Sequence, residues 1–355
     1  MTILNVALIF GGRSAEHDVS TIVARSVYEA LDRKRYNPIL VGVSRDGRWW
    51  LHENTEEFPS QVDSPGVQIA FLPGGGGKAL VHGRNEEGRV RHVDVVLPIL
   101  EEGIVQGVLE TAQVPFVGSR IPTPAISMDK EITKRILRDA GFPVARSLVL
   151  GARDEVKFQF AQQTLCSRSL FVKPSRLHSS IGVRKVTCEP EFQAAVDHAF
   201  SYGSKVLVEE HVQARELECA VLQDVDQPNK LLCSWPSEII PKDIDAFFTY
   251  EAKMDNETGV IVKTKADVDE ATADRTKALS CEAFAVIGCE GLARVDFFMR
   301  PNGELLINEV GTLPGLTPSS LFPRMMQESG IPYNVLVQRL LEYAIKRSEK
   351  SRAVR

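Results

Sequence analysis

Two carboxylates in one stretch of the chain carry the clearest chemistry. Asp296 and Glu309 lie in apolar runs on either side of Asn302-Gly303, within the segment LARVDFFMRPNGELLINEVG at residues 292–311. An Asn-Gly pair between such runs predicts a β-hairpin, because both residues tolerate a positive φ. A hairpin closed at this pair sets Asp296 opposite Glu309, and facing carboxylates repel each other unless a cation lies between them.

The same register sets Arg294 opposite Gly311 on the face that carries the two acids. Carboxylate oxygens suit Mg²⁺, and protein-bound Mg²⁺ usually holds phosphate oxygens as well. The hairpin therefore predicts a metal pair and phosphate chemistry. The simpler alternative is that each acid only caps a turn or forms an ion pair, as most strand carboxylates do.

Two lysines elsewhere are candidates for carrying chemistry. Lys173 ends the apolar strand of FVKPSRLHSSIG (residues 171–182) and leads into a small, polar loop. The hydroxyls and backbone amides of such a loop can close over phosphates. Lys253 ends the aromatic segment FFTYEAK at residues 247–253. A plain surface lysine is the alternative for Lys173, and solvent exposure explains His178 in the same loop better than metal ligation does.

A glycine turn follows the first apolar run, in the sequence GGRSAE at residues 11–16. Backbone N–H groups gather at such a strand-to-helix turn and favour anions. The segment lacks the G-x-G-x-x-G spacing, so a dinucleotide site is poorly supported. Glu16 would suit an ammonium group of a ligand, and a helix N-terminal acid that complements the helix dipole is an equally good explanation.

Two further segments are weaker candidates for ligand contact. Residues 206–216 (VLVEEHVQARE) run along a strand into Glu209 and turn beside Val212, where backbone groups could contact an adenine edge and Glu216 a ribose. Acidic strand ends are common, so this pattern alone says little. Residues 311–320 form a Gly, Pro and hydroxyl loop whose N–H groups suit a carboxylate or an oxyanion.

The glycine run GGGGKA at residues 74–79 resembles a P-loop only superficially. It lacks the G-x-x-x-x-G-K-[ST] spacing, and we expect a surface loop there. The six cysteines show no C-x-x-C spacing. We interpret them as reduced core residues of a cytosolic protein, not as disulfides or a zinc site.

Length and charge exclude several classes of protein. A chain of 355 residues is long enough for two or three domains. A net charge of −5 and a pI near 5.9 argue against nucleic acid or an anionic membrane as the main partner. The apolar N-terminus has no basic region and runs into a glycine turn, so we expect a buried first strand and no signal peptide. No run of 18 apolar residues that could span a membrane is present.

The first third of the chain has an α/β pattern. Strands are expected at residues 3–10, 38–43 and 93–99 and a helix at 20–31, with edge strands at 49–51 and 67–72 and a further helix from 107. A β-α-β opening implies parallel strands and a right-handed crossover. We therefore predict a doubly wound parallel sheet that extends to about residue 117 and binds its ligand at the strand C-termini.

From residue 127 onward the pattern is α+β. We expect one helix over residues 127–140 and strands followed by a helix up to residue 203, then a second strand-rich block. A long helix at 271–287, the hairpin and a terminal helix at 334–346 complete it. Alternating helices and antiparallel strand pairs predict a domain of two lobes. The charged tail that begins near Arg347 looks disordered.

Taken in order, the segments resemble the D-alanine–D-alanine ligases of the ATP-grasp superfamily, over residues 3–345. The resemblance is carried by GGRSAEHDVS, PFVGS, SMDKEITKRIL, FVKPSRLHSSIGV, VEEHV with ARELECAVL, FTYEAK, GLARVDFF and INE followed by PG. It implies an N-terminal substrate domain at residues 1–120, a central ATP-grasp lobe at 121–205 and a C-terminal ATP-grasp lobe at 206–355. It also implies a homodimer formed through the N-terminal domain.

The resemblance further implies a role for each matching residue. Lys130 and Lys173 would bind the ATP phosphates, with Lys253 near the γ-phosphate. Glu209 and Val212 would contact the adenine, and Glu216 the ribose. Asp296 and Glu309 would hold two Mg²⁺ ions, with Mn²⁺ as the alternative metal. The substrate contacts would come from Glu16 (the first ammonium), Ser179 (the loop over the first substrate), Arg294 and Gly315 (the tetrahedral intermediate), and Ser320 and Leu321 (the second carboxylate).

Three positions depart from the family pattern. The loop that normally supplies a His before the Gln-Gly helix is shortened to Leu100-Glu101-Glu102-Gly103, Met254 stands where a Tyr is usual, and Gly311 replaces a metal-binding Asn. Because the first two changes surround the first-substrate pocket, we expect an ATP-dependent carboxylate–amine ligase of a specialised dipeptide or antibiotic-type pathway. The alternatives are a housekeeping D-alanine–D-alanine ligase of peptidoglycan synthesis and a non-catalytic ATP-binding regulator.

Overall fold

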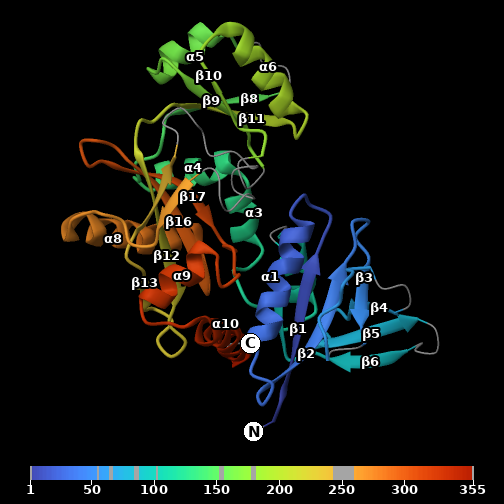
Figure 1. The fold of residues 1–355 in the computed structure, drawn as a ribbon. Coiled ribbons are helices and arrows are strands. Elements are labelled where there is room, and N and C mark those ends of the chain that lie inside the picture. Colours follow the sequence, from blue (N-terminus) through green and yellow to red (C-terminus); the bar gives the residue numbers. More distant parts are fainter. Residues whose placement is uncertain are drawn as a thin grey trace.

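The computed structural model describes residues 2–53, 56–63, 67–83, 88–100, 103–151, 156–176, 181–242 and 260–353. Figure 1 shows the fold, in which the strands of these residues form three β-sheets. The first sheet has the order β6-β5-β4-β3-β2-β1-β7. Its strands are β1 (Leu4–Gly11), β2 (Tyr36–Val43), β3 (Trp49–His52), β4 (Val67–Phe71), β5 (Lys78–Gly83), β6 (Arg89–His92) and β7 (Val95–Pro98).

The first sheet is mixed, so the predicted parallel sheet is confirmed only for its β-α-β part. Strand β1 pairs in parallel with β2 and with β7. Strands β3 to β6 extend the sheet as antiparallel neighbours beyond β2. The physical reason is connection length, since the short links between β4, β5 and β6 cannot hold the crossover that parallel pairing requires.

Strand β1 is the centre of the N-terminal core. Its residues from Val6 to Phe10 have no exposed surface, because strands flank it on both sides and helices cover both faces. One face packs against α1 (His17–Ala30) and α10 (Tyr333–Ala353). The other face packs against α2 (Ile104–Thr111). The strand ends at the glycine turn that leads to Glu16.

The helix predicted over residues 127–140 is two helices, α3 (Pro122–Met128) and α4 (Lys130–Asp139). Asp129 breaks it, because this residue adopts an extended conformation and its side chain accepts a hydrogen bond from the Ile132 N–H at 3.3 Å. Aspartate is a preferred N-cap residue for this reason. The Lys130 N–H then donates to the Ser175 carbonyl at 2.9 Å. The break therefore sets Lys130 at the first turn of a new helix.

The second sheet is antiparallel and has the order β10-β9-β11-β8. Its apolar face is covered by two helices, one of which, α5, was not predicted from the sequence. The elements are β8 (Ser147–Gly151), α5 (Phe158–Leu165), β9 (Leu170–Pro174), β10 (Arg184–Val186), α6 (Glu189–Phe200) and β11 (Lys205–Glu210).

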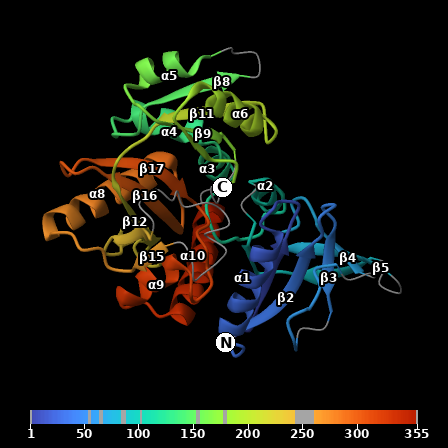
Figure 2. The same cartoon turned by 45° about the horizontal axis from the view of Figure 1, so that its top comes forward.

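The third sheet has the order β15-β14-β12-β16-β17, with β13 paired to β12. Helix α8 packs on one face, and α9 and α10 pack on the side of β12 that faces the N-terminal core. Figures 1 and 2 show the second sheet above the third, with α3 and α4 between them. The elements are β12 (Arg215–Gln223), β13 (Leu231–Cys233), β14 (Ser237–Pro241), β15 (Val260–Lys263), α8 (Glu270–Ile287), β16 (Leu292–Met299), β17 (Leu305–Gly311) and α9 (Leu321–Glu328).

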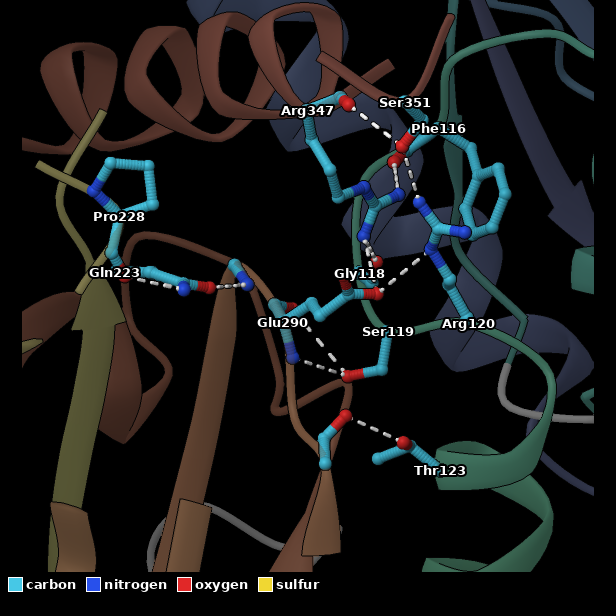
Figure 3. Close-up of polar contacts among 12 residues, drawn as sticks. Phe116, Gly118, Ser119, Arg120, Thr123, Gln223, Pro228, Glu290, Arg347 and Ser351 are labelled. Atoms are coloured by element: carbon cyan, nitrogen blue, oxygen red, sulfur yellow. Dashed lines mark hydrogen bonds and ion pairs between the residues drawn. The ribbon is translucent and has the colours of Figure 1, made fainter. Parts of the chain in front are cut away.

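Helix α10 continues to Ala353, so the prediction of a disordered tail from about Arg347 was wrong. The Arg347 guanidinium donates to the carbonyl oxygens of Phe116 and Gly118, both at 2.7 Å, and to Glu290 at 3.0 Å (Figure 3). A buried arginine of this kind cannot leave its partners without a large penalty. These contacts fix the segment between the first sheet and α3 against both α10 and the start of β16.

Candidate active site

The β16–β17 hairpin has the predicted register at its functional end. Asp296 pairs with Glu309, and Arg294 pairs with Gly311. Both pairs lie in antiparallel strands, and β17 is the edge strand of the third sheet. The two carboxylates therefore face each other as expected from the sequence.

The turn of this hairpin differs from the prediction. Arg300 N–H donates to the Glu304 carbonyl and Gly303 N–H to the Arg300 carbonyl, both at 2.9 Å, so the loop has three residues instead of two. Gly303 takes a positive φ of 82°, as a loop of this length requires. The register shifts back at a β-bulge directly after Asp296, where Asn308 is left over. The longer turn shifts the pairing by one residue and the bulge shifts it back. Asp296 therefore still pairs with Glu309, as predicted.

A third carboxylate, Glu218, extends the pair and was missed from the sequence. It lies on β12 directly opposite Asp296. Arg294 donates from Nε and Nη2 to the two Asp296 oxygens, both at 2.7 Å, and its Nε lies 3.1 Å from Glu218 Oε2. Burial alone would lower the pKa of Arg294, but Asp296 and Glu218 hold it well above its usual value. The guanidinium is thus a cation between two carboxylates.

A second charged group has the opposite composition. Glu209 on β11 contacts two lysines, with Oε1 2.9 Å from Lys134 Nζ and Oε2 2.5 Å from Lys173 Nζ. The side chains of Lys134 and Glu209 are 1% and 3% exposed. Burial would raise the pKa of Glu209, but the two lysines lower it, while burial lowers the pKa of Lys134. Glu209 is therefore an anion between two cations.

Lys130 brings a further cation to the acids of the third sheet. Its Nζ lies 3.6 Å from Glu309 Oε1, and the residue is 8% exposed. It comes from the first turn of α4, one helical turn before Lys134, so both lysines project from the same face of that helix. The break at Asp129 thus orients two of the three lysines of the site.

Asp129 is itself held by cations from neighbouring elements. Its carboxylate accepts hydrogen bonds from Lys205 and Arg176, both at 3.0 Å, and from Ser175 at 2.6 Å. Burial would raise the pKa of Asp129, but these hydrogen bonds lower it to about 2. The start of α4 is therefore fixed to the second sheet by a charged cluster.

A cavity of about 920 Å³ connects the charged groups. All three sheets and the loops at their ends contribute to its wall. Most residues singled out from the sequence line it: Glu16, Lys130, Lys173, Glu209, Val212, Glu216, Arg294, Asp296, Glu309, Gly315 and Leu321. Ser320 is not among the lining residues, and Ser179, Lys253 and Met254 lie outside the described residues.

The loop that carries Glu16 is held by its neighbours. Gly11 has a φ of +93°, and a Cβ there would lie 2.4 Å from the Val43 carbonyl oxygen, so only glycine fits. The Gly11 N–H donates to Ser20 Oγ at 3.0 Å, and His17 Nδ1 lies 2.7 Å from the Gly12 oxygen. These contacts fix the end of β1 and direct Glu16 to the cavity.

On the far side of the cavity, Gly315 and Ser320 lie against each other. A Cβ on Gly315 would lie 2.9 Å from Ser320 Oγ, so a side chain at this position would require Ser320 to move. Ser320 Oγ lies 2.7 Å from Thr317 Oγ1 and accepts from the Thr317 N–H at 3.2 Å. The hydroxyl thus shapes this loop, and its predicted contact with a substrate carboxylate stays a prediction.

Of the remaining sequence predictions, some are confirmed, one is partly wrong and one lies outside the described residues. Residues 73–77 form turns before β5, as expected for a surface loop, while His178 lies outside the described residues. All six cysteines are free, as predicted, but Cys166 and Cys188 are exposed and so are not core residues. No helix in the described part of the chain has the length and apolar character needed to cross a membrane.

Comparison with known proteins decides the family. The model of the D-Ala–D-Ala ligase N-terminus matches residues 5–119, and the model of the C-terminus matches residues 136–342. A D-alanine–D-alanine ligase A from Mesorhizobium japonicum is 44% identical over 351 residues, covering 96% of this chain and 97% of the relative. The chain belongs to the D-alanine–D-alanine ligase family.

Solved structures of family members agree. The D-alanine–D-alanine ligase from Coxiella burnetii has a TM-score of 0.86 and 30% identity, with 100% of this chain and 97% of that chain covered. The VanG D-Ala:D-Ser ligase from Enterococcus faecalis has a TM-score of 0.83 and 29% identity, with 97% and 100% covered. As a family member, the chain is an ADP-forming ATP-grasp ligase that makes C–N bonds.

Asp296 and Glu309 fit the divalent metal that the family resemblance implies. Their carboxylates face each other on the cavity wall, and hard oxygen ligands are those that Mg²⁺ prefers. Within the described residues no cluster of three or more His, Cys, Asp or Glu is spaced as a metal site. Mg²⁺ would therefore be held by these two acids together with phosphate oxygens and water.

Gly311 leaves room where a third ligand would be expected. A Cβ built on it would have one neighbour within 4 Å, the Arg294 carbonyl oxygen at 3.9 Å. Its φ is not positive, so a side chain is compatible with the backbone. Neither the backbone conformation nor the surrounding space therefore requires glycine at position 311.

Proposed function

We propose that this chain is an ATP-dependent D-alanine–D-alanine ligase of peptidoglycan synthesis. The observation that carries the proposal is that one cavity joins Glu16, the lysine group around Glu209 and the facing carboxylates Asp296 and Glu309. The curated relatives, which bear the name D-alanine–D-alanine ligase, favour this housekeeping alternative over the specialised dipeptide pathway that we had preferred from the three sequence departures.

The first chemical step makes the carboxylate of one D-alanine reactive. A carboxylate is a poor electrophile, so one of its oxygens first attacks the γ-phosphorus of ATP. The bond from that phosphorus to the oxygen bridging the β- and γ-phosphates breaks, which releases ADP and gives an acyl phosphate. Lys130 and Lys173, which both line the cavity, would neutralise phosphate charge. When bound by Asp296 and Glu309, Mg²⁺ supplies further neutralisation of the phosphate oxygens.

The second step forms the peptide bond. The amine of the second D-alanine attacks the acyl carbon, and the bond from that carbon to the phosphate oxygen breaks. Arg294 would stabilise the oxyanion that forms in between, because its guanidinium lies beside the carboxylate pair on the cavity wall. Glu16 would bind the ammonium of the first D-alanine, and Gly315 and Leu321 would border the second substrate.

The nucleotide would lie against the second sheet. Glu209 and Val212 would contact the adenine and Glu216 the ribose. All three residues line the cavity, and they lie close together in the chain where β11 is followed by β12. The roles of Ser179 and Lys253 rest on the family resemblance alone. We further propose a cytoplasmic homodimer that binds no nucleic acid and no membrane.

The test is ADP release with single and paired amino acids. We expect D-alanine alone to give rapid ADP release and a dipeptide, and L-alanine to give neither. D-Serine belongs in the panel because one structural relative is named a D-Ala:D-Ser ligase. Turnover only with other acid–amine pairs would restore the specialised pathway, and ATP binding without turnover for any pair would favour a regulator.

A further inference from the structure

Lys134 is a buried cation that the proposed reaction does not use. Its side chain is 1% exposed, and it lies behind the cavity wall that Lys173 and Glu209 form. A lone buried ammonium would lose its proton or destabilise the fold. Lys134 is tolerated because Glu209 lies 2.9 Å from it. Glu209, a single buried carboxylate, thus contacts two lysines, one more than its neutralisation requires.

We propose that Lys134 is a positioning residue which neutralises Glu209 permanently and thereby leaves Lys173 available to the phosphates of ATP. The inference rests on the proposed function for the identity of the anion. With two ammonium groups and one carboxylate, the group carries one positive charge in excess. Without Lys134, Glu209 and Lys173 would form a neutral pair, and burial would hold them together.

The geometry lets Lys173 move independently. The two lysines contact different oxygens of Glu209, Lys134 at Oε1 and Lys173 at Oε2, so Lys173 can turn toward a phosphate while the other contact stays in place. Lys173 lines the cavity and Lys134 does not. Lys173 is therefore the lysine that can bind a ligand, and Lys134 can neutralise Glu209 while it does so.

Helix α4 holds Lys134 in its position. The helix begins at Asp129, whose carboxylate is bound by Lys205, Arg176 and Ser175. Lys173 instead lies near the end of β9 and lines the cavity. One lysine is thus fixed by a rigid element, and the other lies at the end of a strand.

The charges around Lys134 support its assignment to Glu209 and that of Lys173 to the phosphates. Burial lowers the pKa of Lys134, Glu209 raises it, and the neighbouring Lys173 lowers it again. Glu209 keeps a lowered pKa with both lysines as causes, although burial opposes this. When Lys173 turns to a phosphate, Lys134 remains as the partner that keeps Glu209 ionised.

The experiment is direct ATP binding by calorimetry with the full chain and its K134M variant. Methionine keeps the volume and removes the charge. We expect ATP to bind about 10- to 100-fold more weakly, the scale of one charge-assisted hydrogen bond. The KM for D-alanine should stay within about twofold, because Glu16 lies in the loop between β1 and α1 of the N-terminal part and not among the residues that contact Lys134. Unchanged ATP affinity in folded K134M would overturn the proposal.

The double variant K134M/E209Q makes the test sharper. Removing the carboxylate frees Lys173 again, so ATP affinity should recover at least about tenfold relative to K134M, a coupling that independent sites do not show. A double variant that binds ATP no better than K134M would overturn the proposal.

If K134M does not fold, the double variant is compared with E209Q. Both lack the Glu209 carboxylate, so any contact of that carboxylate with the adenine is lost equally from both. With no carboxylate to hold Lys173, we expect the loss of Lys134 to change ATP affinity by no more than about threefold. Binding by the folded double variant that is about 10- to 100-fold weaker than by E209Q would contradict the inference. Failure of the wild type itself to bind ATP would refute the proposed function and not the role of Lys134.

Discussion

The two charged groups of the cavity are built alike with the signs exchanged. In the group on the second sheet, one carboxylate, Glu209, lies between Lys134 and Lys173. In the group on the third sheet, one guanidinium, Arg294, lies between Glu218 and Asp296. In the lysine group Lys173 lines the cavity and Lys134 is buried behind its wall, whereas in the carboxylate group both Glu218 and Asp296 line the cavity. The lysine group can therefore offer the charge of Lys173 while Lys134 keeps Glu209 neutralised, and in the carboxylate group two acids that line the cavity share Arg294.

The two groups differ in net charge, and this difference indicates which ligand each one binds. The lysine group has an excess positive charge and suits phosphate oxygens. The carboxylate group has an excess negative charge and, with Glu309, suits a divalent cation. The same cavity thus separates the anionic and cationic parts of a metal–nucleotide complex onto two different sheets. Single substitutions in each group can break or sharpen this comparison.

The largest effect should come from E309Q on the metal side. We expect turnover to fall to background, more than about 10³-fold, because a neutral amide holds Mg²⁺ poorly and the phosphate charge is left unneutralised. Steady-state ADP release at saturating Mg²⁺ measures this. Near-normal activity in a folded variant would refute the assignment of Glu309 to the metal.

R294A should separate catalysis from nucleotide binding. We expect kcat to fall about 10²- to 10³-fold, since Arg294 stabilises charge that forms only during ligation. The dissociation constant for ATP, measured by calorimetry, should change by no more than about threefold because the lysine group is intact. Equal losses in kcat and in ATP affinity would contradict this role.

E218Q tests whether the metal side works as the lysine side does. Without the Glu218 charge, Arg294 would hold Asp296 as a neutral pair, and we expect the Mg²⁺ concentration for half-maximal rate to rise about tenfold. ADP release titrated with Mg²⁺ at saturating ATP gives this number, with E238Q as the control on the neighbouring strand. An unchanged Mg²⁺ requirement would show that the two groups are alike in geometry only.

The smallest effect on catalysis and a clear effect on stability are expected for D129N. Asp129 anchors the helix that carries Lys130 and Lys134, and its pKa is lowered to about 2 by its hydrogen bonds against the effect of burial. Its stabilisation is thus fully present above its unfolded pKa of about 3.9 and is lost as pH falls through the folded value.

For D129N the free energy of unfolding should therefore drop by about 2 kcal/mol at pH 7. Urea unfolding at pH 7 and at about pH 2.5 measures the difference between the variant and the wild type, which should shrink at the lower pH. A difference that does not depend on pH would mean that Asp129 acts through its cap alone.

The sequence predicted the metal side better than the lysine side. Asp296 and Glu309 were found because strand alternation and a turn signal act locally. Even so, the sequence did not predict the three-residue turn or the bulge at Asn308. The predicted pairing of Asp296 with Glu309 is correct only because the two shifts in register cancel. Glu218 could have been found from its alternation with Glu216 in an apolar strand. Its pairing with Asp296, however, depends on strand order.

Other features could not be predicted because distant segments create them. Lys134 follows Lys130 by one helical turn, a spacing that was visible in the sequence, yet its burial depends on the second sheet lying over α4. The tail around Arg347 is charged and looks solvated, but its contacts with Phe116 and Gly118 order it. The mixed first sheet likewise follows from connections that a β-α-β opening does not reveal. The division into three domains stays a prediction.

The central claim is that the lysine and carboxylate groups cooperate to phosphorylate a substrate carboxylate. The most direct measurement is the transfer of ¹⁸O from D-alanine labelled in its carboxylate, followed by mass spectrometry of the phosphate released with ADP. An acyl phosphate places one substrate oxygen in the bridge to phosphorus, so we expect one ¹⁸O in each phosphate released and a labelled dipeptide. Unlabelled phosphate accompanied by normal dipeptide formation would contradict the account.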